Sequence, residues 1–231
     1  MKTTINANVA AFDKVLGFCG TLGSRYQPVK ESINPSSLQE MLQRAKRSME
    51  LVNVWWEANT SAISERAHVH QQLPVLATRV MNSLIVAGAP RHLIDDVRSV
   101  KRKLSYRRSK NAAKVSSESN EQSKGNPAAQ LDYLSKAEVF EKFMHLLKSF
   151  PGYATNETDL TIESLEKHLA LVKRLSDNVR ATGIHLATAR SNRNDLVKRM
   201  IKEAGDVKRY VRAAFGHASN EYNFLSKIRF F

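Results

Sequence analysis

The chain has 231 residues, a formal net charge of +14, 42% hydrophobic residues and one cysteine. This composition is ordinary for a globular protein of one large or two small domains, and the lone Cys19 excludes an internal disulfide and favours a reducing compartment. No run of about 18 apolar residues and no signal peptide are present, so we expect no membrane span and a cytoplasmic protein.

In the first half, apolar residues recur every three or four positions, which predicts helices. A short helix is expected over 4–22, a long one over 34–87 and a third over 91–106. Because a proline inside a helix removes one backbone hydrogen bond and clashes with the preceding turn, we expect a kink or a break between Ser61 and Pro74.

The second half repeats this order after a polar stretch. Residues 107–130 are rich in Ser, Asn, Lys, Glu and Gly and predict a flexible basic linker. Helices are then expected over 131–149, 160–215 and 218–228. Runs with period-two alternation are absent, so the predicted class is all-α.

The two long helical segments share one apolar pattern at a constant sequence offset, the one that takes Tyr26 to Tyr153. We call it the repeat offset. Ten of the eleven seam positions in the second segment have an apolar partner in the first, and Ser37, Leu38, Arg66 and Val80 also recur as identical residues at this offset. Two generic amphipathic helices aligned by chance are the alternative. The pattern favours an internal duplication.

We therefore predict a helical bundle of two pseudo-two-fold-related repeats, 1–106 and 131–231, with long kinked antiparallel helices. A single amphipathic hairpin cannot cover its own apolar stripe. The two repeats are expected to pack on each other as one domain, which buries both stripes.

Two arginines related by the repeat offset, Arg66 and Arg193, fall on the apolar seam. A buried guanidinium needs carboxylates or carbonyls, because an unpaired buried charge is costly. One reading is a buried ion-pair network with Glu65, Asp195 or Asp206. The others are an anion-binding pocket at the pseudo-symmetry axis and exposure at a helix break.

Basic residues are concentrated in two regions. Residues 98–124 carry a net charge of +7 and residues 167–231 a net charge of +9. The densest run predicts a phosphate-binding patch on a helix end, or else a solvated flank of the linker. Its candidate residues are Lys101, Arg102, Lys103, Arg107, Arg108 and Lys110.

Signals for catalysis or metal binding are weak. The chain lacks the common nucleophile, phosphate-loop and zinc-protease motifs, and the Glu65-x-x-His68 spacing of di-iron bundles has no second copy. We expect no catalytic residue, no metal and no cofactor. The adjacent Trp55 and Trp56 point about 100° apart on a helix, so one is expected in the core and the other near the surface.

Several short phrases resemble an uncharacterised family of all-helical proteins common in Bacteroidetes bacteria. They are Tyr210-Val-Arg-Ala-Ala-Phe-Gly216 with Ser219-x-x-Tyr222 and Arg229-Phe230, Ser64-Glu-Arg-Ala67 with Thr78-Arg-Val80, and Arg190-x-x-Arg193-Asn194. The resemblance implies a helical fold in a bacterial cytoplasm. It implies no activity or ligand.

Three functions remain open at this stage. The first is a non-enzymatic helical scaffold that holds a protein partner or a second copy of itself. The second is non-sequence-specific nucleic-acid binding through the basic linker and the C-terminal helices, and the third is binding of a small anion at the seam arginines.

Overall fold

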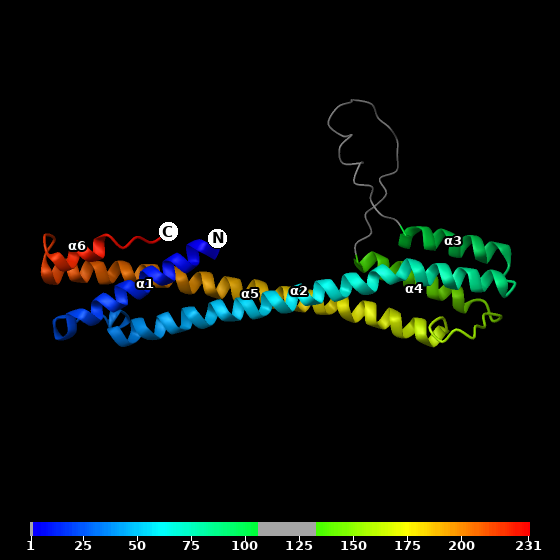
Figure 1. Cartoon of the computed structure of the whole chain (residues 1–231), viewed down its shortest axis with the longest axis horizontal. Coiled ribbons are helices and arrows are strands. Elements are labelled where there is room, and N and C mark those ends of the chain that lie inside the picture. The colour runs from blue at the N-terminus through cyan, green and yellow to red at the C-terminus, as the bar shows by residue number, and fades with distance from the viewer. Residues whose placement is uncertain (1, 106–132) are drawn as a thin grey trace, which may run out of the picture. The chain divides into compact units, whose positions relative to one another are not determined.

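The computed structural model describes residues 2–105 and 133–231. In this part of the chain the structure is all-α, with two short 3-10 turns and no strand (Figure 1). The α-helices are α1 (Lys2–Leu22), α2 (Pro35–Val86), α3 (Arg91–Ser105), α4 (Tyr133–Lys148), α5 (Ile162–Phe215) and α6 (Asn220–Ser226), and the 3-10 turns are Gly23–Arg25 and Glu31–Ile33. The predicted all-α class is confirmed.

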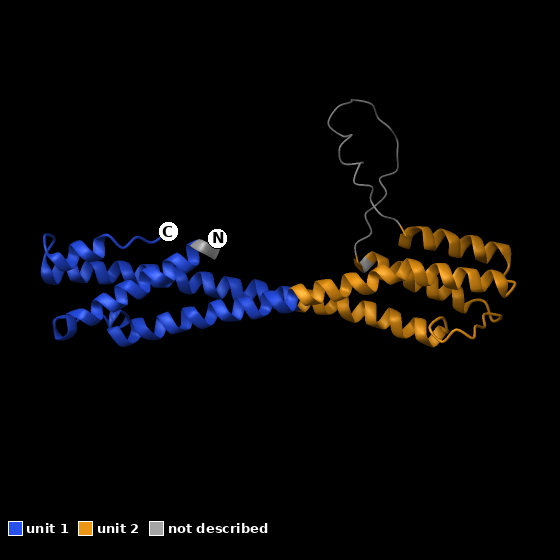
Figure 2. Ribbon diagram, in the orientation of Figure 1, with its two compact units in different colours: residues 1–59, 182–231 blue, residues 60–181 orange. Residues whose placement is uncertain are grey.

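The chain forms two compact units (Figure 2). Unit 1 contains Met1–Asn59 and Thr182–Phe231, and unit 2 contains Thr60–Ala181. Each unit therefore takes segments from both expected repeats, because α2 and α5 each contribute one half to unit 1 and the other to unit 2. The expected linker, 107–130, lies outside the described residues.

The main core of unit 1 combines four helices. Buried residues of α1 and the N-terminal part of α2 pack against the C-terminal part of α5 and against Leu225 of α6; the largest fully buried members are Phe12, Leu38, Leu42, Met200 and Leu225. Farther along the same two long helices, only Val52, Leu186 and Ala189 form a small separate cluster, with Trp55 against it. In unit 1, α2 and α5 are antiparallel, as the bond from Thr182 Oγ1 to Asn59 Oδ1 (3.2 Å) and the Trp55–His185 stack require.

The core of unit 2 has the same make-up from other segments. The C-terminal part of α2 and the N-terminal part of α5 pack with α3 and α4. Its fully buried large side chains include Leu73, Leu84, Phe140, Phe143 and Leu165. Burial of a side chain of this kind stabilises a fold by about 1.5–3 kcal/mol.

The long helix α2 continues through Pro74 without a break. The missing N–H leaves one turn without its hydrogen bond, but Leu73 and Ala77 on either side are fully buried. Thr78 Oγ1 donates to the Pro74 carbonyl at 2.7 Å within the next turn. Packing on both sides holds the helix together, so of the kink or break expected between Ser61 and Pro74 the break does not form. The kink stays a prediction.

Two tyrosines related by the repeat offset close the turns that precede the long helices. Tyr26 Oη donates to the carbonyl of Ile33 at 2.8 Å, and Tyr153 Oη donates to the carbonyl of Leu160 at 2.8 Å. Both side chains are buried. Each bond satisfies a carbonyl just before a long helix begins. The repeat offset takes the donor Tyr26 to Tyr153, and it takes the acceptor Ile33 to Leu160.

Glycines with positive φ end both long helices. Gly88 follows α2 with φ +75°, and Gly216 follows α5 with φ +92°. The Gly216 N–H bonds the Arg212 carbonyl at 3.0 Å, and the Gly88 N–H bonds the Ile85 carbonyl at 3.1 Å. A residue with a Cβ is disfavoured in this left-handed conformation, which explains glycine at both ends.

An ion pair in each unit fastens the turn to the neighbouring long helix. In unit 1, Lys30 Nζ lies 2.6 Å from Asp206 and 2.7 Å from Glu203. In unit 2, Asp159 pairs with Arg79. The repeat offset takes Arg79 to Asp206, so the helix carries the acid in one unit and the base in the other.

Candidate functional site

The two seam arginines are half-buried and belong to different units. In unit 2, the Arg66 guanidinium lies 4.0 Å from the centre of the Tyr133 ring, and its buried Nε has no hydrogen-bond partner among the described residues. In unit 1, Arg193 donates to Asn194 Oδ1 from Nε (3.3 Å) and Nη2 (3.0 Å). Burial and the neighbouring Arg190 lower the pKa of Arg193.

The carboxylates expected beside these arginines bind elsewhere. Glu65 accepts a hydrogen bond from Ser61 at 3.0 Å, Asp195 faces Lys198 at 3.7 Å, and Asp206 pairs with Lys30. Among the described residues no ion pair reaches Arg66 or Arg193, so the expected buried ion-pair network does not form there. The aromatic face of Tyr133 and the Asn194 amide take its place.

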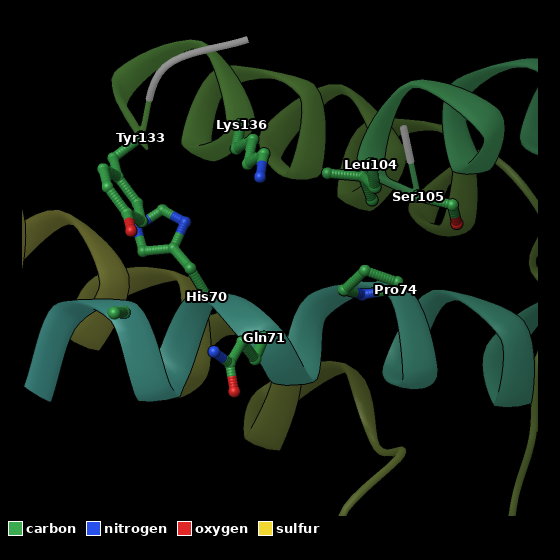
Figure 3. Close-up of a pocket in the computed structure, with 8 residues that line it drawn as sticks. His70, Gln71, Pro74, Leu104, Ser105, Tyr133 and Lys136 are labelled. Atoms are coloured by element: carbon green, nitrogen blue, oxygen red, sulfur yellow. The ribbon is translucent and has the colours of Figure 1, made fainter. Parts of the chain in front are cut away.

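A pocket of about 530 Å³ lies beside Arg66 in unit 2 (Figure 3). Its walls come from α2, from the last turn of α3 and from the first turn of α4; the lining residues are Ala67, His70, Gln71, Pro74, Leu104, Ser105, Tyr133 and Lys136. Figure 3 shows the His70 ring beside Tyr133, the Lys136 side chain reaching into the space between this pair and Leu104, and Pro74 and Leu104 at the other end. The pocket therefore has a polar end and an apolar end.

The His70 side chain is unusual for a core residue. It is only 4% exposed, and neither ring nitrogen has a hydrogen-bond partner among the described residues. Its ring meets the Tyr133 ring edge-on, with 4.8 Å between centroids. Burial, reinforced by Lys136, Arg66 and His168, lowers the pKa of His70 from 6.5 to about 4, so the ring is neutral at pH 7.

A second histidine of the same unit, His168 on α5, is half-buried. Its Nε2 is also buried without a partner in the described part of the chain, and its ring meets the edge of Phe140. Burial lowers its pKa as well. Around His70, unit 2 thus gathers a second imidazole, that of His168, and two cations, Arg66 and Lys136.

The basic run predicted to bind phosphate is only partly described. Lys101, Arg102 and Lys103 lie in the last two turns of α3, where Arg102 and Lys103 are exposed. The other three candidates, Arg107, Arg108 and Lys110, lie outside the described residues. Arg102 and Lys103 are thus open to solvent and Lys101 is half-buried, and the phosphate-binding patch stays a prediction.

A groove in unit 1 brings three arginines together. Arg44 and Arg47 of α2 face Arg199 of α5 across a space of about 410 Å³, whose wall also includes Asp195. On α2, Arg44, Arg47, Leu51 and Val54 follow one another at spacings of three or four residues, so they form one stripe, which we call the α2 stripe. Leu51 is 48% exposed and Val54 is 58% exposed.

The two tryptophans differ in exposure, although neither is fully buried in a core as was expected of one of them. Trp55 is half-buried and stacks on His185 of α5 with 4.3 Å between ring centroids, whereas Trp56 is exposed. Trp55 thus helps to hold the small two-helix cluster of unit 1.

The sequence reasoning did not select His70, Tyr133 or Lys136. A signal for His70 was present, because Arg66, His70 and Pro74 follow one another at four-residue intervals on one face of α2. Tyr133 and Lys136 are distant in sequence and gave no signal.

Two further properties concern the described residues only. No helix there is long and apolar enough to cross a membrane. Within the same ranges, no group of three or more His, Cys, Asp or Glu side chains has an arrangement that could hold a metal ion.

Comparison with known proteins gives no relative, because no protein-family profile, curated protein or solved structure matches the chain.

Proposed function

We propose that this chain is a non-enzymatic helical interaction protein that binds an amphipathic partner helix along the α2 stripe. The observation that carries this proposal is the second, exposed apolar stripe on α2. Val52 already faces the small core of α2 and α5, yet Leu51 and Val54 continue outside it. Exposed aliphatic side chains at helical spacing are the anchors on which a partner helix packs.

The charge on the stripe indicates the chemistry of the partner. Arg44 and Arg47 extend the stripe from Leu51 toward the N-terminus of α2, and Arg199 adds a third cation across the groove. Asp195 is the only carboxylate that lines the groove among the described residues. A partner helix with acidic side chains next to its apolar stripe complements this surface, whereas a second copy would bring like charges together.

A binding titration tests this proposal. The probe is a synthetic amphipathic peptide with a leucine stripe flanked by glutamates, followed by fluorescence anisotropy, and the control peptide has lysines in place of the glutamates. Leu51→Lys and Arg47→Glu should each weaken binding of the acidic peptide about tenfold or more. Val75→Lys, at an exposed aliphatic of α2 outside the stripe, should leave it unchanged.

The result could contradict the proposal in two ways. Equal binding of both peptides, or binding insensitive to Leu51→Lys, would show that no specific helix site exists on the stripe. Sedimentation of the chain alone over a range of concentrations separates these results from self-association, which would instead identify a second copy as the occupant.

Nucleic-acid binding is a second candidate, favoured by the three arginines of the groove. Phosphate contacts make affinity fall steeply with salt concentration. Titration with single-stranded and duplex nucleic acid at low and moderate salt tests it, with Arg44→Gln and Arg199→Gln as variants. If neither single-stranded nor duplex nucleic acid binds at low salt, this candidate is ruled out.

We also propose that the scaffold arose as two repeats related by the repeat offset. The matched tyrosine bonds and the helix positions of the two ion pairs, Arg79 and Asp206, stand at the repeat offset and support this origin; the terminal glycines, Gly88 and Gly216, lie one residue off it. If Asp206 and Arg79 occupy equivalent helix positions, unit 1 should tolerate the arrangement of unit 2, with the base on the long helix and the acid on the turn. Lys30→Asp and Asp206→Arg should each lower the Tm, and the double variant should recover most of the loss; additive losses would contradict equivalence.

A further inference from the structure

We infer that the pocket between α2, α3 and α4 is a binding site for a small organic carboxylate with an apolar body. Its volume of about 530 Å³ lies within the about 300–1,000 Å³ that small-molecule sites occupy. This site is separate from the α2 stripe and does not depend on it, because all its lining residues belong to unit 2.

The polar end of the pocket requires a partner that the described protein does not supply. Both nitrogens of His70 are buried without hydrogen bonds, although buried polar atoms are paired in the great majority of cases. Leaving a buried donor or acceptor unpaired destabilises the folded chain, because the group has lost its hydrogen bonds to water. A ligand oxygen that accepts the His70 N–H removes part of this cost.

The charges around this end favour an anion. Lys136 lines the pocket, and the Arg66 guanidinium lies 4.0 Å from the centre of the ring of Tyr133, another lining residue. None of the lining residues, all of them described, carries a carboxylate. A ligand carboxylate would accept hydrogen bonds from the Lys136 ammonium and the His70 ring, and charge-assisted bonds of this kind are stronger than neutral ones.

The other end of the pocket favours an organic anion over an inorganic one. Pro74 and Leu104 lie away from the His70 ring (Figure 3), and they form the apolar wall of this end. A planar hydrocarbon body would occupy this end, with Ser105 at its edge. An inorganic phosphate would satisfy the polar end and leave the apolar walls uncovered.

Titration of the full chain with three probes tests this inference. 2-Naphthoate carries both the carboxylate and the apolar body, 2-naphthalenemethanol carries only the body, and inorganic phosphate carries only the charge. We expect saturable binding of 2-naphthoate by calorimetry, with a change in the His70 ring resonances in NMR spectra, and binding of the other two at least about tenfold weaker.

Matched variants locate the binding. Lys136→Met should weaken 2-naphthoate binding about tenfold or more, since it removes a charged hydrogen-bond donor. Lys142→Met, at an exposed lysine of the same helix that does not line the pocket, should leave it unchanged. Circular dichroism confirms that both variants keep their helices, and the His70 resonances of the unmodified chain report binding independently.

Three outcomes would overturn the inference. Absence of saturable 2-naphthoate binding removes the site. Equal affinity for the alcohol, or no effect of Lys136→Met, would mean that the pocket takes apolar molecules without recognising a carboxylate. Tighter binding of phosphate than of 2-naphthoate would assign the polar end to inorganic anions.

Discussion

Acidification should destabilise this protein through His70. The folded chain buries this imidazole in its neutral form, with a pKa of about 4, while an unfolded histidine has a pKa of about 6.5. Between these two values the unfolded chain binds a proton that the folded chain does not. Protonation therefore favours unfolding, and the stability associated with the neutral ring is complete above about pH 6.5 and is lost as the pH falls toward about 4.

The magnitude follows from the two pKa values. Each pKa unit corresponds to about 1.36 kcal/mol, so the whole transition is worth about 3 kcal/mol, and about 2–3 kcal/mol of it is lost between about pH 7 and about pH 4.5. This loss is a large fraction of the 5–15 kcal/mol of stability typical of a domain.

Denaturant unfolding followed by circular dichroism measures the effect over this pH range. The control is His70→Phe, which keeps an aromatic ring against Tyr133 but cannot bind a proton. His168 and the carboxylates titrate in both proteins, so the difference between their pH profiles isolates His70. An NMR titration of the His70 ring gives its pKa directly.

The same experiment can refute the reasoning. Identical losses of stability in the two proteins would show that His70 is not buried in its neutral form. A ring that titrates near 6.5 in the folded chain would lead to the same conclusion. In either case the unpaired nitrogens on which the carboxylate site depends would be solvated.

Three further predictions concern the scaffold. Tyr26→Phe and Tyr153→Phe should each lower the free energy of unfolding by about 1 kcal/mol, because each leaves a carbonyl before a long helix without its donor. Denaturant titrations measure the two losses, and values that differ severalfold would count against equivalent turns. Gly216→Ala should destabilise the protein by about 1 kcal/mol, because Gly216 has φ +92°, a conformation that a Cβ disfavours even with open space around it. Gly205→Ala, inside α5 and also in open space, should stabilise it by about 0.5–1 kcal/mol. Thermal melts measure both effects, and the opposite order would contradict the assigned helix end. Burial raises the pKa of the Cys19 thiol to about 11. A thiol reagent near pH 8 should therefore modify Cys19 only as fast as the folded chain opens. Rapid modification of the folded protein would show that Cys19 is accessible.

The helices were predictable because a helix is a local structure. Apolar residues at three- and four-residue spacing place the long helix α5 at Ile162–Phe215, close to the expected 160–215. The glycine after each long helix marked its end for a local reason as well, since the left-handed conformation there disfavours a Cβ. Pro74 shows the limit of local rules, because buried neighbours in the tertiary structure hold α2 together where its own hydrogen bond is missing.

The candidate site was only partly visible in the sequence. The seam position of Arg66 raised the expectation of a buried guanidinium beside a carboxylate; the side chain is half-buried, and its neighbour in space is an aromatic ring. Tyr133 and Lys136 meet His70 only because α4 packs against α2 within unit 2. No periodicity connects residues so far apart in the chain, so their meeting cannot be read from spacing.

By itself the sequence therefore determined the helices, their apolar faces and the two arginines on the seam, because each follows from the 3.6-residue period of one segment. Only the tertiary structure decided which segments share a core. Each unit takes half of α2 and half of α5, whereas the sequence offered two consecutive repeats. The physical reason is that many apolar faces are interchangeable partners for burial, and the choice among them, like the pocket that results, depends on how all the side chains pack together.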